Sequence, residues 1–426
     1  MLTVGSIITG VAIDIDNRGF GVVKYNSYII FVKELLIGEK ALIEIVEAKK
    51  KYALAVIKEL LIRSDIRRDH NENILGATDL IFMTEKAQLD WQKKITEDTL
   101  LKISNLTPLV YDPLSDLNYF NYRNKTVFHI LPGDTLKFGL YKRAIYELAE
   151  INYFSLASKK ANEIIRALIS NNIEIEENTL KHLVIRTNEK NEALVTIVSK
   201  KESFIGKTDI LNILMQIPKI VGITININTS DNIILSANSK TVYKENKISQ
   251  AIGELKFEID DRSFFQVNVP VIQKAFEIIK ADLNPLDEVI DLYSGVGVIG
   301  FYLADKVKKI TLVETSVNNI YWANEFKLKH SFNHVRIIKG KAEEEIKNLK
   351  GNVLIVDPPR SGIHEQLIEQ IINKKIEKLF YLSCDIKTLA RDLNKLKTSY
   401  YIEKVYPIKM FFQTTAIETL VILKRY

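Results

Sequence analysis

Length, composition and charge set the first limits on this protein. The chain has 426 residues, enough for two or three domains, and combines 46% hydrophobic with 26% charged residues, the balance of a soluble globular protein. No apolar run reaches the ~18 residues that span a bilayer, and no signal-type segment opens the chain, so we expect a cytoplasmic protein with no membrane partner. The net charge of +6 is compatible with a polyanionic partner but does not require one.

Residues 1–62 are predicted to form a small β-barrel. Five short β-rich runs follow one another at a spacing of roughly ten residues, with a turn cluster at 16–21 and a basic turn at 49–52. This spacing is typical of a barrel of the oligonucleotide-binding kind, and lysines beside tyrosine and phenylalanine suit phosphate contacts and base stacking. A barrel that only caps another domain fits this segment equally well.

Residues 63–262 are predicted to form a central α+β domain. Its first element is a helix at 84–104, which we expect to pack on the C-terminal domain. Strand and helix patterns then mix up to residue 260 and indicate no particular chemistry. The apolar positions of helix 84–104 recur at near-helical spacing and are Leu89, Trp91, Ile95, Leu100, Leu101 and Ile103.

Residues 263–426 show a regular alternation of strands and helices. The strands are continuously apolar, which predicts a mostly parallel sheet with helices on both faces. We therefore predict an α/β fold, with a Rossmann-like domain after the N-terminal barrel and the central domain. Ligands bind such sheets at the carboxyl ends of the strands, which is where Glu314, Asp357 and Cys384 fall.

A glycine-rich turn follows the first strand of this domain. It runs from Asp291 to Gly300, and glycines such as Gly295 and Gly297 let the backbone approach a ligand closely. Glu314 ends the next strand, 23 residues after Asp291, where a carboxylate can bind both ribose hydroxyls. Such a pair fits NAD or S-adenosylmethionine, and its late place in the chain favours S-adenosylmethionine.

Two further segments follow later strands of the sheet. Asp357-Pro358-Pro359-Arg360 is rigid because two prolines can continue neither a helix nor a ladder, and it can hold a planar base with Asp357 as an acceptor. Cys384 is the only cysteine, which excludes an intrachain disulfide and a cysteine-built metal cage. It is a candidate nucleophile, although most free cysteines are small core residues.

These segments together resemble the S-adenosylmethionine-dependent RNA uracil-5-methyltransferase family, and residues 1–62 resemble the TRAM domain of its ribosomal-RNA members. The resemblance covers nearly the whole chain and is weakest in the middle. The matching motifs are Ser263-Phe264-Phe265-Gln266-Val267-Asn268, Asp291-Leu292-Tyr293-Ser294-Gly295-Val296-Gly297, Val356-Asp357-Pro358-Pro359-Arg360-Ser361-Gly362, Tyr381-Leu382-Ser383-Cys384-Asp385 and Thr415-Ala416-Ile417-Glu418-Thr419.

The resemblance implies a role for each matching residue. Cys384 matches the family's nucleophile and Glu418 its general base. Cofactor-pocket positions match Gln266, Tyr293, Gly295, Gly297, Glu314 and Asp357. The chemistry implied is methyl transfer from S-adenosylmethionine to C5 of a uracil, through a covalent bond from Cys384 to C6. The target base must leave its stack, and Phe264, Phe265, Phe411 and Phe412 are candidates for lining its pocket.

The chain departs from many relatives at one site. Those relatives bind an iron–sulfur cluster through four cysteines, and the matching positions here are Asp69, Leu75, Thr78 and Phe154. None of these side chains supplies a thiolate, so we expect no iron–sulfur cluster and no other metal. The departure concerns RNA recognition and leaves the methyl-transfer residues intact.

Three functions remain open at this stage. The barrel and the Cys384–Glu418 pair favour a methyltransferase that makes 5-methyluridine in 23S ribosomal RNA. The same chemistry on transfer RNA is the first alternative, and the barrel argues mildly against it. A catalytically idle RNA-binding assembly factor is the second alternative. In each case we expect a monomer that binds RNA.

Overall fold

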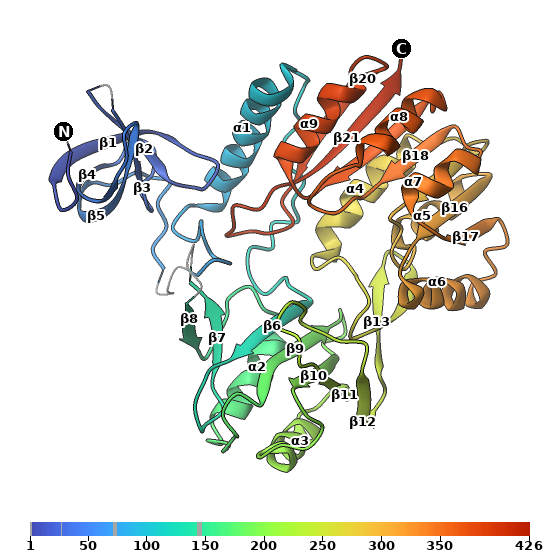
Figure 1. The fold of residues 1–426 in the computed structure, drawn as a ribbon, viewed down its shortest axis with the longest axis horizontal. Helices are drawn as coiled ribbons and strands as arrows, with labels where there is room; N and C mark the ends of the chain where they lie inside the picture. Colours follow the sequence, from blue (N-terminus) through green and yellow to red (C-terminus); the bar gives the residue numbers. More distant parts are fainter. Residues whose placement is uncertain (1, 27, 71–74, 143–146) are drawn as a thin grey trace.

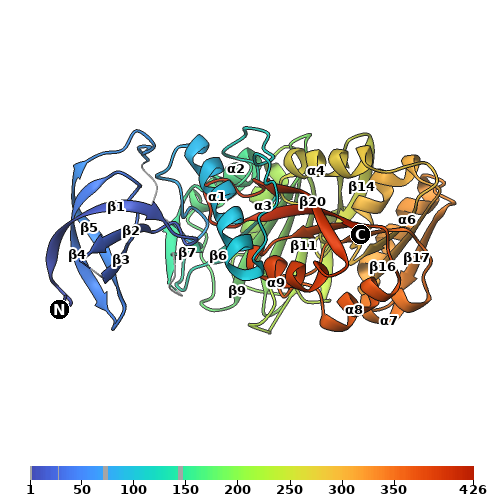
Figure 2. The same cartoon turned by 90° about the horizontal axis from the view of Figure 1, so that it is seen from above.

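The computed structural model describes residues 2–26, 28–70, 75–142 and 147–426, and these form three folded parts (Figure 1). A small barrel comes first, a wide sheet with two helices follows, and a second wide sheet with helices ends the chain. Seen from above, the barrel lies at one end of the molecule and the C-terminal sheet at the other (Figure 2). No helix within these ranges is long and apolar enough to cross a lipid bilayer.

The N-terminal barrel confirms the five strands expected from the sequence. Their order is β1-β2-β3-β5-β4, with β4 paired back to β1 and β3 parallel to β5. Alternate side chains point inward, so Val23, Ile30 and Ile43 are buried in the barrel core. The strands are β1 (Ile7–Ile15), β2 (Gly21–Tyr25), β3 (Tyr28–Val32), β4 (Lys40–Ala48) and β5 (Tyr52–Ile62).

Helix α1 (Glu85–Ser104) connects the barrel to the C-terminal sheet. The Trp91 indole donates a hydrogen bond to the Asp16 carbonyl in the barrel at 3.1 Å, and the Gln92 amide donates to the Ile408 carbonyl at 3.0 Å. Because several parts of the molecule contact α1, its buried residues do not form one stripe. Leu101 and Ile103 are 47% and 42% exposed, unlike the other apolar positions of the predicted helix.

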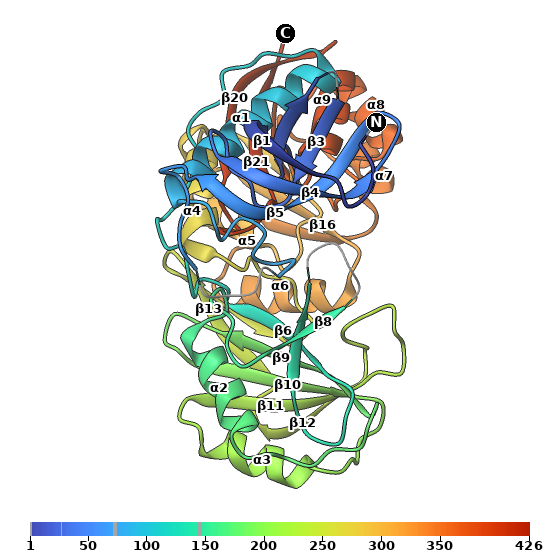
Figure 3. The same cartoon turned by 90° about the vertical axis from the view of Figure 1, so that its left-hand side faces the viewer.

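The central sheet has seven strands in the order β12-β11-β10-β9-β6-β7-β8. Helices α2 and α3 pack on one face, where Ile164 of α2 and Leu214 of α3 share a core with Ile225 of β11 (Figure 3). The elements are β6 (Lys125–Ile130), β7 (Phe138–Tyr141), β8 (Leu148–Ile151), α2 (Lys159–Ile169), β9 (Leu180–Thr187), β10 (Ala193–Ser199), α3 (Lys207–Gln216), β11 (Ile220–Ile227) and β12 (Ser239–Lys244).

The C-terminal sheet confirms the predicted Rossmann-like arrangement. A hairpin of β13 (Lys247–Ile252) and β14 (Leu255–Asp260) leads into it. Its order is β17-β16-β15-β18-β19-β21-β20, with the first five strands parallel and the last two antiparallel to their neighbours. The strands are β15 (Glu288–Leu292), β16 (Lys309–Glu314), β17 (Val335–Lys339), β18 (Val353–Val356), β19 (Lys378–Ser383), β20 (Tyr400–Ile408) and β21 (Glu418–Arg425).

Helices on the C-terminal sheet complete two apolar cores, one on each face. Strand order reverses between β15 and β18, because β16 and β17 extend to one side and the later strands to the other. That reversal is where sheets of this kind bind ligands. The helices are α4 (Val269–Ala281), α5 (Val298–Leu303), α6 (Val317–Lys329), α7 (Ala342–Glu345), α8 (Glu365–Asn373) and α9 (Ile386–Leu396), with short 3-10 turns at Ala304–Lys306 and Ile346–Asn348.

Candidate active site

The carboxyl ends of the parallel strands bring the predicted site residues to one edge of the C-terminal sheet. Glu314 ends β16, Asp357 follows β18, and Cys384 follows β19. Glu418 reaches the same edge by another route, because it begins β21, which is antiparallel to β19. Ser383 and Thr419 are direct partners in that ladder, so the next residues outward, Cys384 and Glu418, are neighbours.

One cavity of about 450 Å³ collects most of these side chains. Its walls are apolar around Phe265, Phe276 and Pro358, and polar elsewhere. Among the residues predicted as catalytic or cofactor-binding, Gly297 alone does not line it. The predicted residues that do are Gln266, Tyr293, Gly295, Glu314, Asp357, Cys384 and Glu418.

The two glycines of the turn have different structural tasks. Gly295 has φ +58°, and a Cβ there would meet no atom within 4 Å, so its backbone faces open space. Its N–H donates to the Glu314 carboxylate at 2.9 Å. Gly297 has φ +83°, and a Cβ there would come within 2.8 Å of the Leu312 side chain. Gly297 therefore allows α5 to pack closely against the sheet.

Glu314 is held in place by backbone N–H groups. Its second carboxylate oxygen accepts hydrogen bonds from the N–H groups of Thr315 at 2.8 Å and Ser316 at 2.7 Å. The carboxylate is thus fixed between the glycine turn and the start of α6. Tyr293 also lines the cavity, while its hydroxyl donates to Glu343 at 3.0 Å and is directed toward α7.

Two buried carboxyl groups at this edge of the sheet have raised pKa values, because burial disfavours their charged forms. Burial, with the nearby charge of Asp357, raises the pKa of Asp291 to about 8, and burial raises the pKa of Asp357 to about 7. One oxygen of Asp291 is buried without a partner among the described residues. The Gln266 amide donates to Asp357 at 3.4 Å. A cationic ligand would relieve this cost, and a sulfonium or ammonium group fits that requirement.

The Cys384 thiol and the Glu418 carboxyl group both have raised pKa values, and Glu418 contributes to the shift of Cys384. Burial and the Glu418 charge raise the pKa of the Cys384 thiol to about 11, and burial with the Asp357 charge raises the pKa of Glu418 to about 8. The Arg360 guanidinium acts in the opposite direction on both groups. A ligand that neutralises the carboxylates would therefore favour the thiolate.

Helix α9 fixes the loop that carries Arg360. The Thr388 hydroxyl donates to the Arg360 carbonyl at 3.2 Å, and the Arg391 guanidinium donates to the Ser361 carbonyl at 2.8 Å. Asp392 accepts the Ile363 N–H at 2.8 Å. Arg391 and Asp392 lie one helical turn after Thr388 on one face of α9. The loop and the Cys384 end of β19 therefore form a single unit.

A second cavity, of about 770 Å³, reaches Cys384 from the other side. Asn17 and Arg18 of the barrel form one wall, and Arg123 of the central domain forms another. The two cavities share Arg360, Cys384, Phe411 and Ala416. Cys384 therefore lines both the first cavity and a larger one that the barrel helps to build.

The four phenylalanines named from the sequence divide between site and core. Phe264 is 60% exposed and lines the first cavity together with the buried Phe265, and Phe411 lines both cavities. The prediction for Phe412 is wrong. Its ring is fully buried in the core of the central domain, because neighbouring residues of this segment point to opposite sides.

Three of the four positions aligned with cluster cysteines are buried, while the fourth, Asp69, is exposed and forms an ion pair with Arg63. Leu75 and Phe154 belong to the core of the central domain, and the Thr78 hydroxyl accepts the Leu75 N–H at 2.9 Å. In the described part of the chain, no three His, Cys, Asp or Glu side chains come together in a way that could hold a metal ion.

Sequence reasoning assigned no role to several residues that shape the site. Arg18, Arg123 and Asn319 line the two cavities from three distant segments. Arg360 was noticed only as part of a motif, although its charge acts on Cys384 and Glu418. No local pattern marks such residues, because only the tertiary fold brings them together.

Comparisons with known proteins show the family of this chain. The family described as tRNA (uracil-5-)-methyltransferase matches residues 84–426. A relative from Clostridium tetani, named an uncharacterized RNA methyltransferase, is 30% identical over 96% of this chain and 94% of its own length. One from Fusobacterium nucleatum with the same description is 29% identical over 100% and 97%.

Among solved structures, the tRNA (uracil-54, C5)-methyltransferase of Pyrococcus abyssi, in complex with S-adenosyl-L-homocysteine, has a similar fold. It superposes with a TM-score of 0.78 and 21% identity, over 97% of this chain and 99% of its own. Since the match spans almost all of both chains, the likeness includes the order of the three folded parts.

Proposed function

Because this chain belongs to the tRNA (uracil-5-)-methyltransferase family, we propose that it transfers a methyl group from S-adenosylmethionine to C5 of a uridine in 23S ribosomal RNA. The observation that carries the proposal is the Cys384–Glu418 pair at one end of the β19–β21 ladder, beside a cavity of about 450 Å³. Nucleophile, base and cofactor cavity thus meet at a single sheet edge.

The first cavity has the features that S-adenosylmethionine requires. When bound, this donor supplies an electrophilic methyl group on a sulfonium. The Glu314 carboxylate, held by three backbone N–H groups, is placed to accept the ribose hydroxyls. Apolar walls around Phe265 and Phe276 suit the adenine, and the desolvated carboxyl group of Asp357 favours a cation nearby.

The chain's own residues perform the remaining chemistry. The Cys384 thiolate adds to C6 of the uracil, and the electron pair of the C5–C6 double bond moves to make C5 a carbon nucleophile. C5 takes the methyl group and the donor leaves as the neutral thioether. Glu418 then removes the C5 proton, the C5–C6 double bond re-forms, and the Cys384 sulfur departs.

The raised pKa of Glu418 matches its role as the base, whereas the Cys384 thiol must lose its proton before it can act. With a pKa of about 8, Glu418 is a stronger base than an ordinary carboxylate, so it can accept a carbon-bound proton more readily. With a pKa of about 11, the thiol of Cys384 is almost entirely protonated in the free protein. The Arg360 charge lowers the pKa of Cys384, so we expect this guanidinium to favour the thiolate.

Transfer RNA is the second candidate substrate, and a particular observation favours it. The Pyrococcus abyssi enzyme named for transfer RNA matches 97% of this chain, which includes the N-terminal barrel. The barrel therefore does not separate the two classes of RNA. The wide cavity beside Cys384, with Arg18 and Arg123 on its walls, suits a polynucleotide of either class.

Nucleoside mass spectrometry tests the proposal directly. The purified protein is incubated with methyl-labelled S-adenosylmethionine and with ribosomal or transfer RNA from a host that lacks 5-methyluridine. Labelled 5-methyluridine in 23S RNA is the expected result. Label in transfer RNA alone would reassign the substrate, and no label in either RNA would support the idle RNA-binding alternative.

A further inference from the structure

A third cavity, of about 420 Å³, adjoins the cofactor cavity at Phe264 and Asn319, which line both. Its walls come from β6, from loop 234–237 and from the start of α6. Two cationic side chains, Lys125 and Arg262, line it, and none of the described residues that line it carries a carboxylate side chain. Its remaining lining residues are Ile234, Leu235, Ser236, Ala237, Ser316 and Asn318.

The cation of Lys125 occupies an unfavourable place on the central sheet. Lys125 on β6 lies directly opposite Arg186 on β9, on the face away from α2 and α3. Like charges directly opposite each other destabilise a sheet. The Lys125 ammonium makes no hydrogen bond or ion pair with any residue that the structure describes. Burial and the Arg186 charge lower the pKa of Lys125 to about 7.

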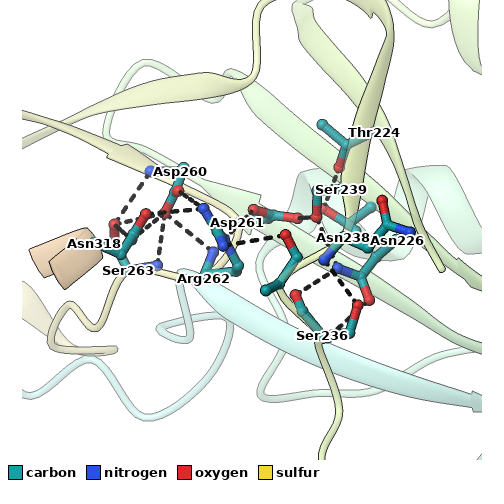
Figure 4. Close-up of polar contacts among 12 residues, drawn as sticks. Thr224, Asn226, Ser236, Asn238, Ser239, Asp260, Asp261, Arg262, Ser263 and Asn318 are labelled. Atoms are coloured by element: carbon teal, nitrogen blue, oxygen red, sulfur yellow. Dashed lines mark hydrogen bonds and ion pairs between the residues drawn. The ribbon is translucent and has the colours of Figure 1, made fainter. Parts of the chain in front are cut away.

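The nearest carboxylates accept hydrogen bonds from other donors. Asp260 accepts from the Ser263 hydroxyl at 2.6 Å and from the Asn318 amide at 3.2 Å, and Asp261 accepts from the Ser239 hydroxyl at 2.7 Å (Figure 4). Arg262 lies between these groups and donates to Asn318 at 2.9 Å. The network orders the cavity wall but leaves the Lys125 charge without a contacting anion.

The first turn of α6 also favours an anionic ligand in the third cavity. Ser316 and Asn318 lie at its N-terminus, where backbone N–H groups and the helix dipole favour a negative ligand. The cavity is also open to a large molecule, because loop residue Ala237 and the neighbouring Phe264 are exposed. Position, charge and access thus describe an anion site at the edge of the cofactor cavity.

We propose that this cavity binds a backbone phosphate of the RNA substrate, close to the nucleotide that is methylated. The inference rests on the proposed function, since it takes RNA to be the polyanion. Lys125 supplies the main counter-charge, while Arg262 and the start of α6 complete the site. A phosphate there would compensate the like-charge pair of Lys125 and Arg186, and it would place the RNA strand across the mouth of the cofactor cavity.

Binding of a fluorescently labelled RNA fragment by the full chain tests the proposal. The fragment is the RNA that the wild type binds most tightly, and binding is measured over a range of KCl concentrations. Lys125→Gln should weaken binding roughly tenfold and lower the slope of log affinity against log salt by about one. Lys125→Arg should restore most of the affinity. Lys159→Gln, on the exposed side of α2, is the matched control and should bind like the wild type.

A phosphate scan identifies the bound group. Single phosphates of the fragment are replaced in turn by uncharged methylphosphonates, and each is measured with the wild type and with Lys125→Gln. One replacement should weaken wild-type binding but leave Lys125→Gln binding unchanged. Ala237→Asp is a second variant, at an exposed position on the rim, and its carboxylate should weaken RNA binding while unfolding temperature stays near that of the wild type.

The outcomes separate this site from the proposed function. Unchanged affinity and salt slope in Lys125→Gln would overturn the phosphate site, even if the wild type methylates RNA. The phosphate site would also be overturned if Lys125→Gln bound RNA normally but had a higher KM for S-adenosylmethionine. If the wild type makes no 5-methyluridine, a Lys125-dependent salt slope and a single sensitive phosphate would still support the site, since binding does not require methyl transfer.

Discussion

The C-terminal sheet edge and the adjoining face of the central sheet bury charges of opposite sign. Around the first cavity, Asp291, Asp357 and Glu418 have raised pKa values because burial disfavours their anions. Around the third cavity, Lys125 has a lowered pKa because burial disfavours its cation. Two residues, Phe264 and Asn319, separate the regions.

This difference indicates which ligand each region is built to receive. A buried group that lacks a counter-charge has a cost that the matching ligand removes. The carboxylate side suits a sulfonium donor, and the cationic side suits a phosphate. The sign of the unmet charge is therefore more informative than cavity size, since the two volumes, about 450 and 420 Å³, are nearly equal.

The largest effect is expected at the nucleophile, on the carboxylate side. Cys384→Ala removes the only thiol and should lower methylation by at least about 10⁴-fold, since no other group can activate C6. The readout is labelled 5-methyluridine in RNA. RNA affinity should stay within about twofold of the wild type, because the cationic side chains that suit RNA, Arg18, Arg123 and Lys125 among them, are unchanged. Substantial activity in this variant would exclude the covalent mechanism.

Removal of the general base, Glu418, should separate methyl transfer from the later removal of the C5 proton. Glu418→Gln should lower turnover by roughly 10²–10⁴-fold, because the C5 proton remains after methyl transfer. The Cys384–RNA bond should then persist and appear as a slowly migrating band on a denaturing gel. Cys384→Ala is the control that must lack this band. Rapid release of product by Glu418→Gln would assign the base to another residue.

Asp291 should affect stability in a way that depends on pH. Its pKa is raised from 3.8 to about 8 in the folded state, so the folded protein loses stability as pH rises from about 4 to about 8. Asp291→Asn lacks this loss and should be more stable than the wild type at pH 8, by on the order of 1–3 kcal/mol, with a smaller difference at pH 5. Chemical denaturation at both pH values measures this. An equal difference at both pH values would show that Asp291 is not titrating as described.

The smallest effect concerns the reactivity of the thiol. The Glu418 charge raises the Cys384 pKa and the Arg360 charge lowers it. At pH 8, Glu418→Gln should therefore speed alkylation of Cys384 by iodoacetamide a few-fold, and Arg360→Gln should slow it a few-fold. The single cysteine makes mass spectrometry of the intact protein sufficient. Changes in the same direction for both variants would indicate altered access instead of altered charge.

The sequence was most informative where structure follows from local rules. Glu314, Asp357 and Cys384 end parallel strands, so their common edge could be predicted from the strand pattern alone. The five-stranded barrel could be predicted from its turn spacing. Gly297 could not be distinguished from Gly295 in this way, because only the packing of Leu312 shows that Gly297 serves the helix and not the cavity.

Other features depend on long-range pairing that no local pattern contains. The neighbouring positions of Cys384 and Glu418 result from the register of β19 against β21. The resemblance to a family named both residues, but spacing could not place them together. The Lys125–Arg186 pair is of the same kind, since it arises from strands far apart in the chain. Phe412 shows the opposite error: it was a candidate for the pocket of the target base, but its ring packs in the core of the central domain.

The β19–β21 register also limits where residues can be inserted into the chain or deleted from it. Side chains alternate between the two faces of a strand, so one residue inserted within β21 would turn the side chains on one side of the insertion to the opposite face. An insertion there would separate the base from the nucleophile without altering either residue. Loop 228–238 has no such ladder to preserve in its exposed part, residues 231–234. Natural or engineered variation in length should therefore be concentrated in residues 231–233 of that loop, before the residues that line the third cavity, and absent from β21.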